Sequence, residues 1–203
     1  SAGNHAQGVA LGAMAKGIKA TIVMPATTPL AKVSATKGYG GNVILEGAAF
    51  DEAYAKALKV QKETNAVFVH PFDDEYVIAG QGTIALETLE NLPDVDMVVV
   101  PVGGGGMISG IASGLKLSNP KIKVVGVESA AVPSMKESID AGKIVTVPAG
   151  VTAAEGINVR TPGNITFEMA EKYVDEIVTV TEAEIAEAML YLIEKGTNLA
   201  DGP

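Results

Sequence analysis

The chain contains one run of four consecutive glycines: Gly103, Gly104, Gly105 and Gly106. Glycine has no Cβ atom, so this stretch of backbone can adopt positive φ angles and approach a ligand closely. The unbroken apolar run before it, at residues 97–100, predicts a buried strand, and the apolar residues between 107 and 117 recur at helical spacing. The glycines therefore join a strand to a helix N-terminus, where unpaired N–H groups and the helix dipole favour an anion. We interpret residues 103–106 as a phosphate-binding loop.

Two other interpretations of this loop are open. The glycines could serve only to pack a helix tightly on a strand, although four in a row are an expensive way to do so because glycine loses much entropy on folding. No Gly-Lys-Ser/Thr follows, which excludes the nucleotide P-loop, and Ile108 or Ser109 stands where the dinucleotide fingerprint requires its last glycine or alanine. A dinucleotide-binding oxidoreductase stays open as an alternative because Glu128 ends the apolar run 122–127, about where a ribose-binding acid would lie.

Composition limits the kind of protein and its partners. With 203 residues and 47% hydrophobic content, the chain can form one α/β domain or two small ones. Its net charge of −9, with no basic stripe, argues against nucleic acid or an anionic membrane as the main partner. The absence of cysteine excludes disulfides and thiolate metal sites and fits a reducing compartment. No apolar run is long enough to span a bilayer, so we expect a cytoplasmic protein.

Strand and helix patterns alternate along most of the chain. We expect strands at residues 20–24, 43–45, 67–69, 97–100, 122–127 and 176–180. We expect helices near residues 9–16, 32–37, 51–63, 76–92, 107–117, 133–141 and 167–173, and one more after residue 181. This alternation predicts parallel strands with right-handed crossovers, that is, an α/β fold. The spacing changes near residue 71, which suggests a boundary there.

The last expected helix has a clear start. Thr181 and Glu184 have the spacing of a capping box, in which each residue's side chain bonds to the other's backbone N–H. Apolar residues then recur on one face, and we expect this face to be buried. Its members are Ile185, Met189, Leu192 and Ile193.

Three motifs occur in a fixed order along the chain. They are Ser1-Ala2-Gly3-Asn4-His5-Ala6-Gln7-Gly8, Ala79-Gly80-Gln81-Gly82-Thr83 and Pro101-Val102-Gly103-Gly104-Gly105-Gly106. Together they resemble the fold-type II pyridoxal-phosphate enzymes, most closely the catabolic threonine dehydratases (threonine ammonia-lyases), with serine racemases as near relatives. Residues 154–166 are similar to the same group, so the resemblance covers essentially the whole chain. It implies parallel twisted sheets with helices on both faces, as in the tryptophan synthase β fold, with a small mobile domain at residues 1–70 and part of a large cofactor-binding domain at 71–203.

The resemblance also implies roles for individual residues. Asn4 would hydrogen-bond the phenolic oxygen of pyridoxal 5′-phosphate, and the N–H groups of Gly103, Gly104, Gly105, Gly106 and Met107 would hold its phosphate. The substrate carboxylate would be bound by the loop made of Ser1, Ala2, Gly3, Asn4 and His5. The implied reaction removes the α-proton and the β-hydroxyl of L-threonine or L-serine and releases a 2-oxo acid and ammonia.

Taken singly, these side chains have more ordinary interpretations. Serine and asparagine at positions such as Ser1 and Asn4 are typical helix caps. A histidine such as His5 is ordinarily a side chain that is solvated or hydrogen-bonded. Only His70 accompanies it, so a histidine metal cluster is not expected. The three motifs in combination favour the cofactor site.

The sequence departs from the family in its extent. The family's Schiff-base lysine lies in a Ser-Phe-Lys-x-Arg-Gly segment before the Ser-Ala-Gly-Asn motif, and its glycine turn near the pyridine nitrogen lies towards the C-terminus; the 203 residues contain neither. We therefore expect a chain truncated at both ends, without a catalytic lysine and impaired in activity. A non-catalytic chain of the same fold, which binds a ligand or itself, is the alternative. Uncovered apolar surface on the sheet predicts a homo-oligomer.

A second departure concerns the racemase branch, where a divalent metal is held by a glutamate, a carbonyl and an aspartate. Here Glu128 is present and Val132 offers a carbonyl, but Ser134 replaces the aspartate. Losing one of two carboxylates weakens a site for a hard cation. We therefore favour a dehydratase over a serine racemase and predict no tightly bound divalent metal.

Overall fold

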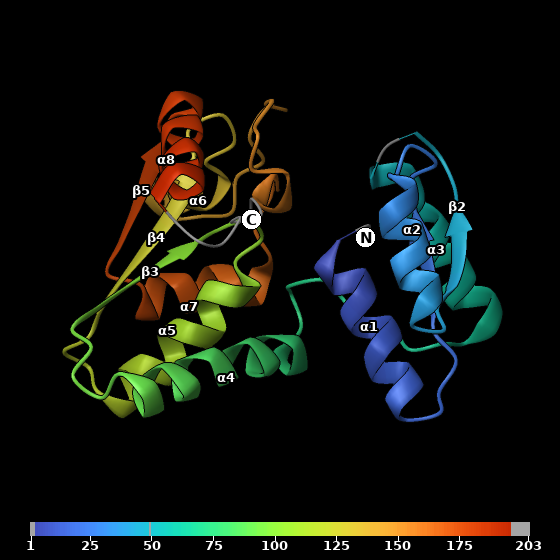
Figure 1. Ribbon diagram of the computed structural model, residues 1–203, viewed down its shortest axis with the longest axis horizontal. Coiled ribbons are helices and arrows are strands. Elements are labelled where there is room, and N and C mark those ends of the chain that lie inside the picture. The colour runs from blue at the N-terminus through green and yellow to red at the C-terminus, as the bar shows by residue number, and fades with distance from the viewer. Residues whose placement is uncertain (1–2, 49, 196–203) are drawn as a thin grey trace. The chain divides into compact units, whose positions relative to one another are not determined.

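The computed structural model of the protein describes residues 3–48 and 50–195 (Figure 1). The chain forms two compact units, Ser1–Pro71 and Phe72–Pro203. The roles expected for the two parts, a small mobile domain and a cofactor-binding domain, stay predictions. Within the described residues, no helix has both the length and the apolar character needed to cross a membrane.

The described residues of the first unit form two parallel strands and three helices. They are α1 (Asn4–Ala15), β1 (Thr21–Met24), α2 (Leu30–Gly38), β2 (Asn42–Leu45) and α3 (Phe50–Thr64). Ile22 of β1 pairs with Val43 of β2, and the buried residues Ala6, Met24 and Val33 complete the small core with Ile22. The helix α1 ends at Ala15 and is followed by its C-cap Lys16 and by Gly17 at φ 65°, as the basic residue followed by glycine predicts.

The strand expected at residues 67–69 is not formed. Residues 66–70 have no regular structure, and Val67 is 88% exposed. A strand needs a neighbour to pair with, and in the described part of this unit β1 and β2 pair with each other. The short apolar run instead offers a backbone carbonyl: Nε2 of His5 donates to the oxygen of Val69 at 3.1 Å.

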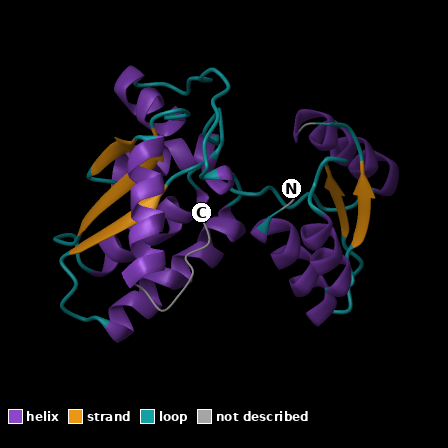
Figure 2. Cartoon of the chain, turned by 45° about the horizontal axis from the view of Figure 1, so that its top comes forward, coloured by secondary structure: helices purple, strands orange, loops and turns teal. Residues whose placement is uncertain are grey.

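The second unit is built on a parallel three-stranded sheet of order β3-β4-β5, drawn as orange arrows in Figure 2. The strands are β3 (Met97–Pro101), β4 (Lys123–Ser129) and β5 (Glu176–Val180). The helices are α4 (Glu75–Asn91), α5 (Gly106–Ser118), α6 (Ser134–Ala141), α7 (Asn164–Tyr173) and α8 (Glu182–Lys195), and a short 3-10 turn spans Glu155–Ile157. Both sheets are parallel, which confirms the predicted α/β class.

Close packing of α4 on α5 accounts for Gly82 of the second sequence motif, whereas a Cβ atom on Gly80 would meet nothing within 4 Å. A Cβ atom added to Gly110 would collide with the carbonyl oxygen of Ile78 and lie 2.6 Å from the nitrogen of Gly82, and one added to Gly114 would lie 2.7 Å from Cβ of Ala85. The two helices lie side by side in Figure 1. Glycines in both helices therefore allow their backbones to touch, and α5 is held firmly behind the glycine loop.

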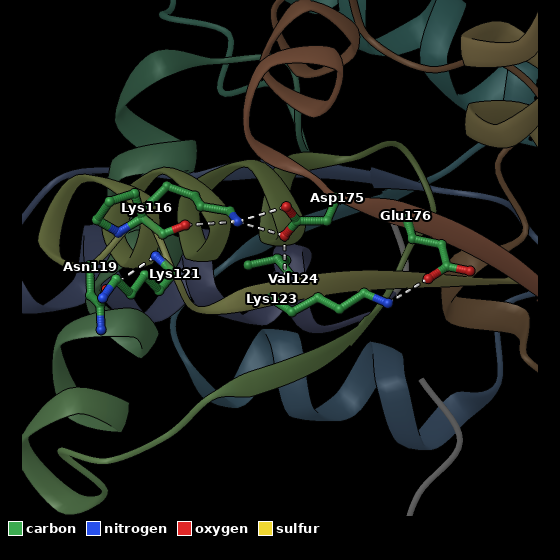
Figure 3. Close-up of polar contacts among 8 residues, drawn as sticks. Lys116, Asn119, Lys121, Lys123, Val124, Asp175 and Glu176 are labelled. Carbon is green, nitrogen blue, oxygen red and sulfur yellow. Dashed lines mark hydrogen bonds and ion pairs between the residues drawn. The ribbon is translucent and has the colours of Figure 1, made fainter.

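Charged residues join α5 to the beginning of the sheet (Figure 3). Lys116, in the last turn of α5, bonds through Nζ to Oδ2 of Asp175 at 2.6 Å. The same carboxylate oxygen accepts the N–H of Val124 in β4 at 2.7 Å. Lys123 and Glu176 form a neighbouring ion pair at 2.8 Å. The glycine loop follows the opposite, carboxyl end of β3, so α5 is fixed at both ends.

The last helix was only partly predicted. The capping box is confirmed: the N–H of Thr181 donates to Glu184 at 2.7 Å, and the N–H of Glu184 donates to Oγ1 of Thr181 at 3.3 Å. The predicted burial is wrong, because Met189, Leu192 and Ile193 are 37%, 41% and 55% exposed and Ile185 is only half-buried. Periodicity defines an apolar face, but burial of that face needs a packing partner. No other described residue buries the apolar face of α8.

Candidate functional site

The glycine loop has the strand-to-helix geometry that its sequence predicts. The strand β3 ends at Pro101, and α5 begins at Gly106. Gly105 is the N-cap of α5 and has φ 96°, a left-handed conformation that favours glycine. The first turn of a 13-residue helix thus opens directly from the loop.

Five successive backbone N–H groups in this loop have no acceptor among the described residues. They belong to Gly103, Gly104, Gly105, Gly106 and Met107. The three glycines at 104–106 are buried. Buried N–H groups without partners are rare because each one loses its bond to water. A bound anion would satisfy several of them and would lie at the positive end of the α5 dipole, so the loop fits a phosphate group.

The other side of the loop is filled by protein. A Cβ atom on Gly104 would collide with the ring of Phe72, and one on Gly106 would lie 2.9 Å from Cα of Phe72. One on Gly103 would lie 3.0 Å from Cα of Ile157. This close packing concerns the α-carbons of the glycines, and its partners Phe72 and Ile157 do not belong to a strand. It does not compete with the phosphate interpretation, which concerns the N–H groups.

Two residues that the sequence did not single out hold this loop. Oγ1 of Thr166 donates to the carbonyl oxygen of Gly104 at 2.6 Å. Asp73 accepts the N–H groups of Asn164, Ile165 and Thr166 at 2.9, 2.8 and 3.3 Å. Asp73 therefore caps α7 from 91 residues earlier in the sequence. This long-range cap lets α7 begin at Asn164, three residues before the start expected from apolar spacing.

Sequence signals for these two residues differ in strength. Thr166 is the third residue of α7 and accepts the N–H of the N-cap Gly163 at 3.0 Å, but Gly163 and Thr166 do not have the Ser/Thr-x-x-Glu/Gln signature of a capping box, so the local signal is weak. Asp73 has no local signal, because its partners are distant in sequence.

Glu128 has a structural role at the end of β4. Its side chain is 1% exposed, and its two carboxylate oxygens accept the N–H groups of Met135 and Lys136 at 2.9 and 2.8 Å. Burial raises the pKa of Glu128 to about 7, against the opposing effect of the two N–H groups and the Lys136 ammonium. Because both oxygens bind the start of α6, the residue proposed for a dinucleotide ribose is already engaged.

Ser134, the residue that differs from the racemase branch, is also engaged in a hydrogen bond within the protein. The hydroxyl of Ser134 donates to the carbonyl oxygen of Val159 at 2.6 Å, and Ser134 is fully buried. Across residues 3–48 and 50–195, no three acidic or histidine side chains are grouped as a metal ion would require.

The first sequence motif lies in the other unit. Ser1 and Ala2 are outside the described residues. Gly3 is the N-cap of α1, and the side chain of Asn4 is exposed and bonds to no other described residue, so Asn4 does not cap the helix. His5 is bonded to Val69. The assignment of Asn4 to the cofactor and of residues 1–5 to the substrate stays a prediction.

Comparison with known proteins gives matches over the whole chain. A family model described as pyridoxal-phosphate dependent enzyme matches residues 1–202. The chain is 56% identical to an L-threonine ammonia-lyase of Thermotoga maritima and 52% identical to one of Geobacter sulfurreducens, over 202 residues in each case. These alignments cover 100% of the chain and 50% of each relative, so the chain spans about half the length of the curated relatives it matches.

Solved structures also match the chain, at lower sequence identity. Threonine deaminase isoform 2 from Solanum lycopersicum, in its processed form, is 40% identical with a TM-score of 0.95, covering 100% of this chain and 59% of that one. Maize serine racemase is also 40% identical, with a TM-score of 0.91, covering 96% of this chain and 59% of that one. Structural similarity alone does not separate the two activities.

Proposed function

Because this chain belongs to the family of pyridoxal-phosphate dependent enzymes, we propose that it is the core of a threonine/serine dehydratase. Such an enzyme eliminates water from L-threonine or L-serine to give an enamine, which tautomerises to an imine, and a water molecule then hydrolyses the imine to ammonia and 2-oxobutanoate or pyruvate. The observation that carries the proposal is the glycine loop at the start of α5, where five N–H groups have no acceptor among the residues that the structure describes. The names of the curated relatives, at 52% and 56% identity, support the choice of reaction.

The glycine loop would bind the 5′-phosphate of the cofactor. The N–H groups of residues 103–107 would each be able to donate to a phosphate oxygen, and hydrogen bonds to a charged acceptor are roughly twice as strong as neutral ones. The α5 dipole would add to this attraction. Because the α-carbons of the glycines contact Phe72 and Ile157, the donors are held in place before the ligand arrives.

The first motif, residues 1–8, would bind the phenolic oxygen of the cofactor and the carboxylate of the substrate. When bound, pyridoxal phosphate supplies an electron sink for the electrons left at the substrate α-carbon after proton removal. The free amide of Asn4 would donate to the phenolic oxygen of the cofactor. The substrate carboxylate would be held by Ser1, Ala2, Gly3 and His5 together with Asn4, at the start of α1, where helical N–H groups favour a negative charge.

Serine racemase is the second candidate, supported by the maize structure. The dehydratase is favoured because the metal-binding carboxylates of the racemase branch are incomplete here. Ser134 contributes a hydroxyl that is already bonded to Val159, and both oxygens of Glu128 are bonded to α6. A homo-oligomeric state and a cytoplasmic location stay predictions.

The products distinguish the candidates. The purified chain is supplied with pyridoxal phosphate and L-threonine, L-serine or, as a control, D-threonine, and bound cofactor, 2-oxo acid, ammonia and D-serine are measured. A 2-oxo acid formed from the L-substrates above the rate of free cofactor supports the dehydratase, whereas D-serine without 2-oxo acid supports the racemase. Bound cofactor with neither product would support the alternative that the chain binds a ligand without catalysing a reaction.

A further inference from the structure

Thr166 connects α7 to the glycine loop through its hydroxyl. The residue is fully buried, and its Oγ1 donates to the carbonyl oxygen of Gly104 at 2.6 Å while accepting the N–H of Gly163 at 3.0 Å. The only further bond from a described residue to this carbonyl is a long one, from the N–H of Gly163 at 3.4 Å. The hydroxyl is therefore the main restraint on the Gly104 carbonyl.

Restraining this carbonyl also restrains the adjacent N–H group. The C=O of Gly104 and the N–H of Gly105 belong to one planar trans peptide, so they point in opposite directions. A hydrogen bond that draws the oxygen towards Thr166 directs the N–H of Gly105 away from it. Glycines on both sides of this peptide make its rotation easy when nothing holds it.

Thr166 is itself held in position by two further contacts. Its backbone N–H donates to Asp73, which also binds the next two residues towards the start of α7. Its side chain lies directly against the loop, because a Cβ atom on Gly105 would be 2.8 Å from Cβ of Thr166 and 2.5 Å from Cε of Met135. The hydroxyl thus has little freedom to follow a moving peptide.

We propose that Thr166 is a positioning residue for anion binding: by holding the Gly104 carbonyl, its hydroxyl aims the Gly105 N–H at the phosphate. This inference rests on the proposed role of the glycine loop as the phosphate site. This role differs from simple capping of α7. Capping alone would affect the stability of α7 and leave the direction of the Gly105 N–H unchanged.

The experiment compares Thr166→Val, which keeps the shape but removes the hydroxyl, with Thr166→Ser, which keeps the hydroxyl. Thr36→Val is the matched control, because Thr36 is also fully buried and donates its hydroxyl to a helical carbonyl, that of Lys32 at 2.9 Å. Each ¹⁵N-labelled chain is titrated with inorganic phosphate, and the amide signals of residues 103–107 are followed. Spectra without phosphate report the state of the Gly104–Gly105 peptide itself.

The expected result is that Thr166→Val weakens phosphate binding about tenfold, through lost preorganisation of one donor. It should also shift or broaden the Gly105 amide signal in the free chain. Thr166→Ser should restore both properties to within about twofold, and Thr36→Val should leave both unchanged.

Unchanged phosphate affinity in Thr166→Val would overturn the inference. If the unmodified chain does not bind phosphate, the proposed function of the loop fails instead, and the free-chain spectra decide the inference alone. In that case a Gly105 amide signal that is the same in Thr166→Val and the unmodified chain overturns it, and a signal that moves in Thr166→Val and returns in Thr166→Ser supports the restraint on the peptide.

Discussion

Lys116 and Asp175 form an ion pair with 2.6 Å between Nζ and Oδ2, joining the end of α5 to the residue before β5. The pair is partly shielded, with the Lys116 side chain 15% exposed and that of Asp175 39% exposed. Because Asp175 also accepts the N–H of Val124, one carboxylate connects a helix and two strands. It thereby fixes the end of α5 that is remote from the glycine loop.

Asp175→Asn should lower the free energy of unfolding by about 1–2 kcal/mol near neutral pH, since a charged hydrogen-bond acceptor is lost. Burial alone would raise the pKa of Asp175, but the Lys116 ammonium and the Val124 N–H outweigh burial and hold the pKa below its ordinary value of 3.8. The stabilisation is therefore present above pH 3.8 and is lost as the pH falls below it. Denaturant unfolding followed by NMR signals of β4 measures the difference.

The control for Asp175 is Asp140→Asn. Asp140 also pairs with a lysine, Lys136, at 3.0 Å, but its side chain is 60% exposed. We expect this change to alter stability by less than about 0.5 kcal/mol. Equal effects of the two substitutions would show that the Lys116–Asp175 pair contributes no more than an ordinary surface pair.

Glu128 predicts a pH dependence of the opposite sign. Burial raises its pKa from 4.5 to about 7 despite the bonds from Met135 and Lys136, so the folded chain binds a proton more readily than the unfolded chain in this interval. The free energy of unfolding should therefore fall as pH rises from 4.5 to about 7, by on the order of 3 kcal/mol for this group.

Glu128→Gln should remove this slope. It should also lower stability at acidic pH, because the amide nitrogen of glutamine cannot accept one of the two N–H groups of α6. Glu168→Gln, the same change on the exposed side of α7, serves as the control. Unfolding curves at several pH values between 4.5 and 7 give the comparison; an unaltered slope in Glu128→Gln would contradict the assignment.

Two helical glycines should respond oppositely to alanine. Gly80 is exposed and a Cβ atom there meets nothing within 4 Å, so Gly80→Ala should stabilise α4 by about 1 kcal/mol. Gly110→Ala would drive a methyl group into the carbonyl of Ile78 and should destabilise by about 2–3 kcal/mol. Thermal or denaturant unfolding of both variants tests the α4–α5 contact, and a Gly110→Ala protein as stable as the unmodified chain would rule this packing out.

Local sequence signals were enough for the glycine junction and for the start of α8. The junction depends on a strand, a run of glycines and a helix that follow one another in the chain. The capping box joins Thr181 to Glu184, only three residues away. Such features need no knowledge of distant partners.

The features that were missed all depend on distant partners. The start of α7 is set by Asp73. Met189 and Leu192 are exposed because no other described residue packs over them. Residues 67–69 have strand-like side chains but no strand beside them. The contacts of Glu128 were likewise invisible, because an acidic residue after a strand has the same sequence signature whether it binds a ligand or caps a helix.

The central claim is that the N–H groups of residues 103–107 hold the cofactor phosphate. The most direct measurement is the affinity of the ¹⁵N-labelled chain for pyridoxal 5′-phosphate and for pyridoxal, which lacks the phosphate, with the amide signals of the loop recorded in the same titrations. We expect the phosphate ester to bind on the order of 100-fold more tightly and to shift the signals of Gly103 to Met107. Equal affinities, or binding of the phosphate ester that leaves these amide signals unmoved, would contradict the claim.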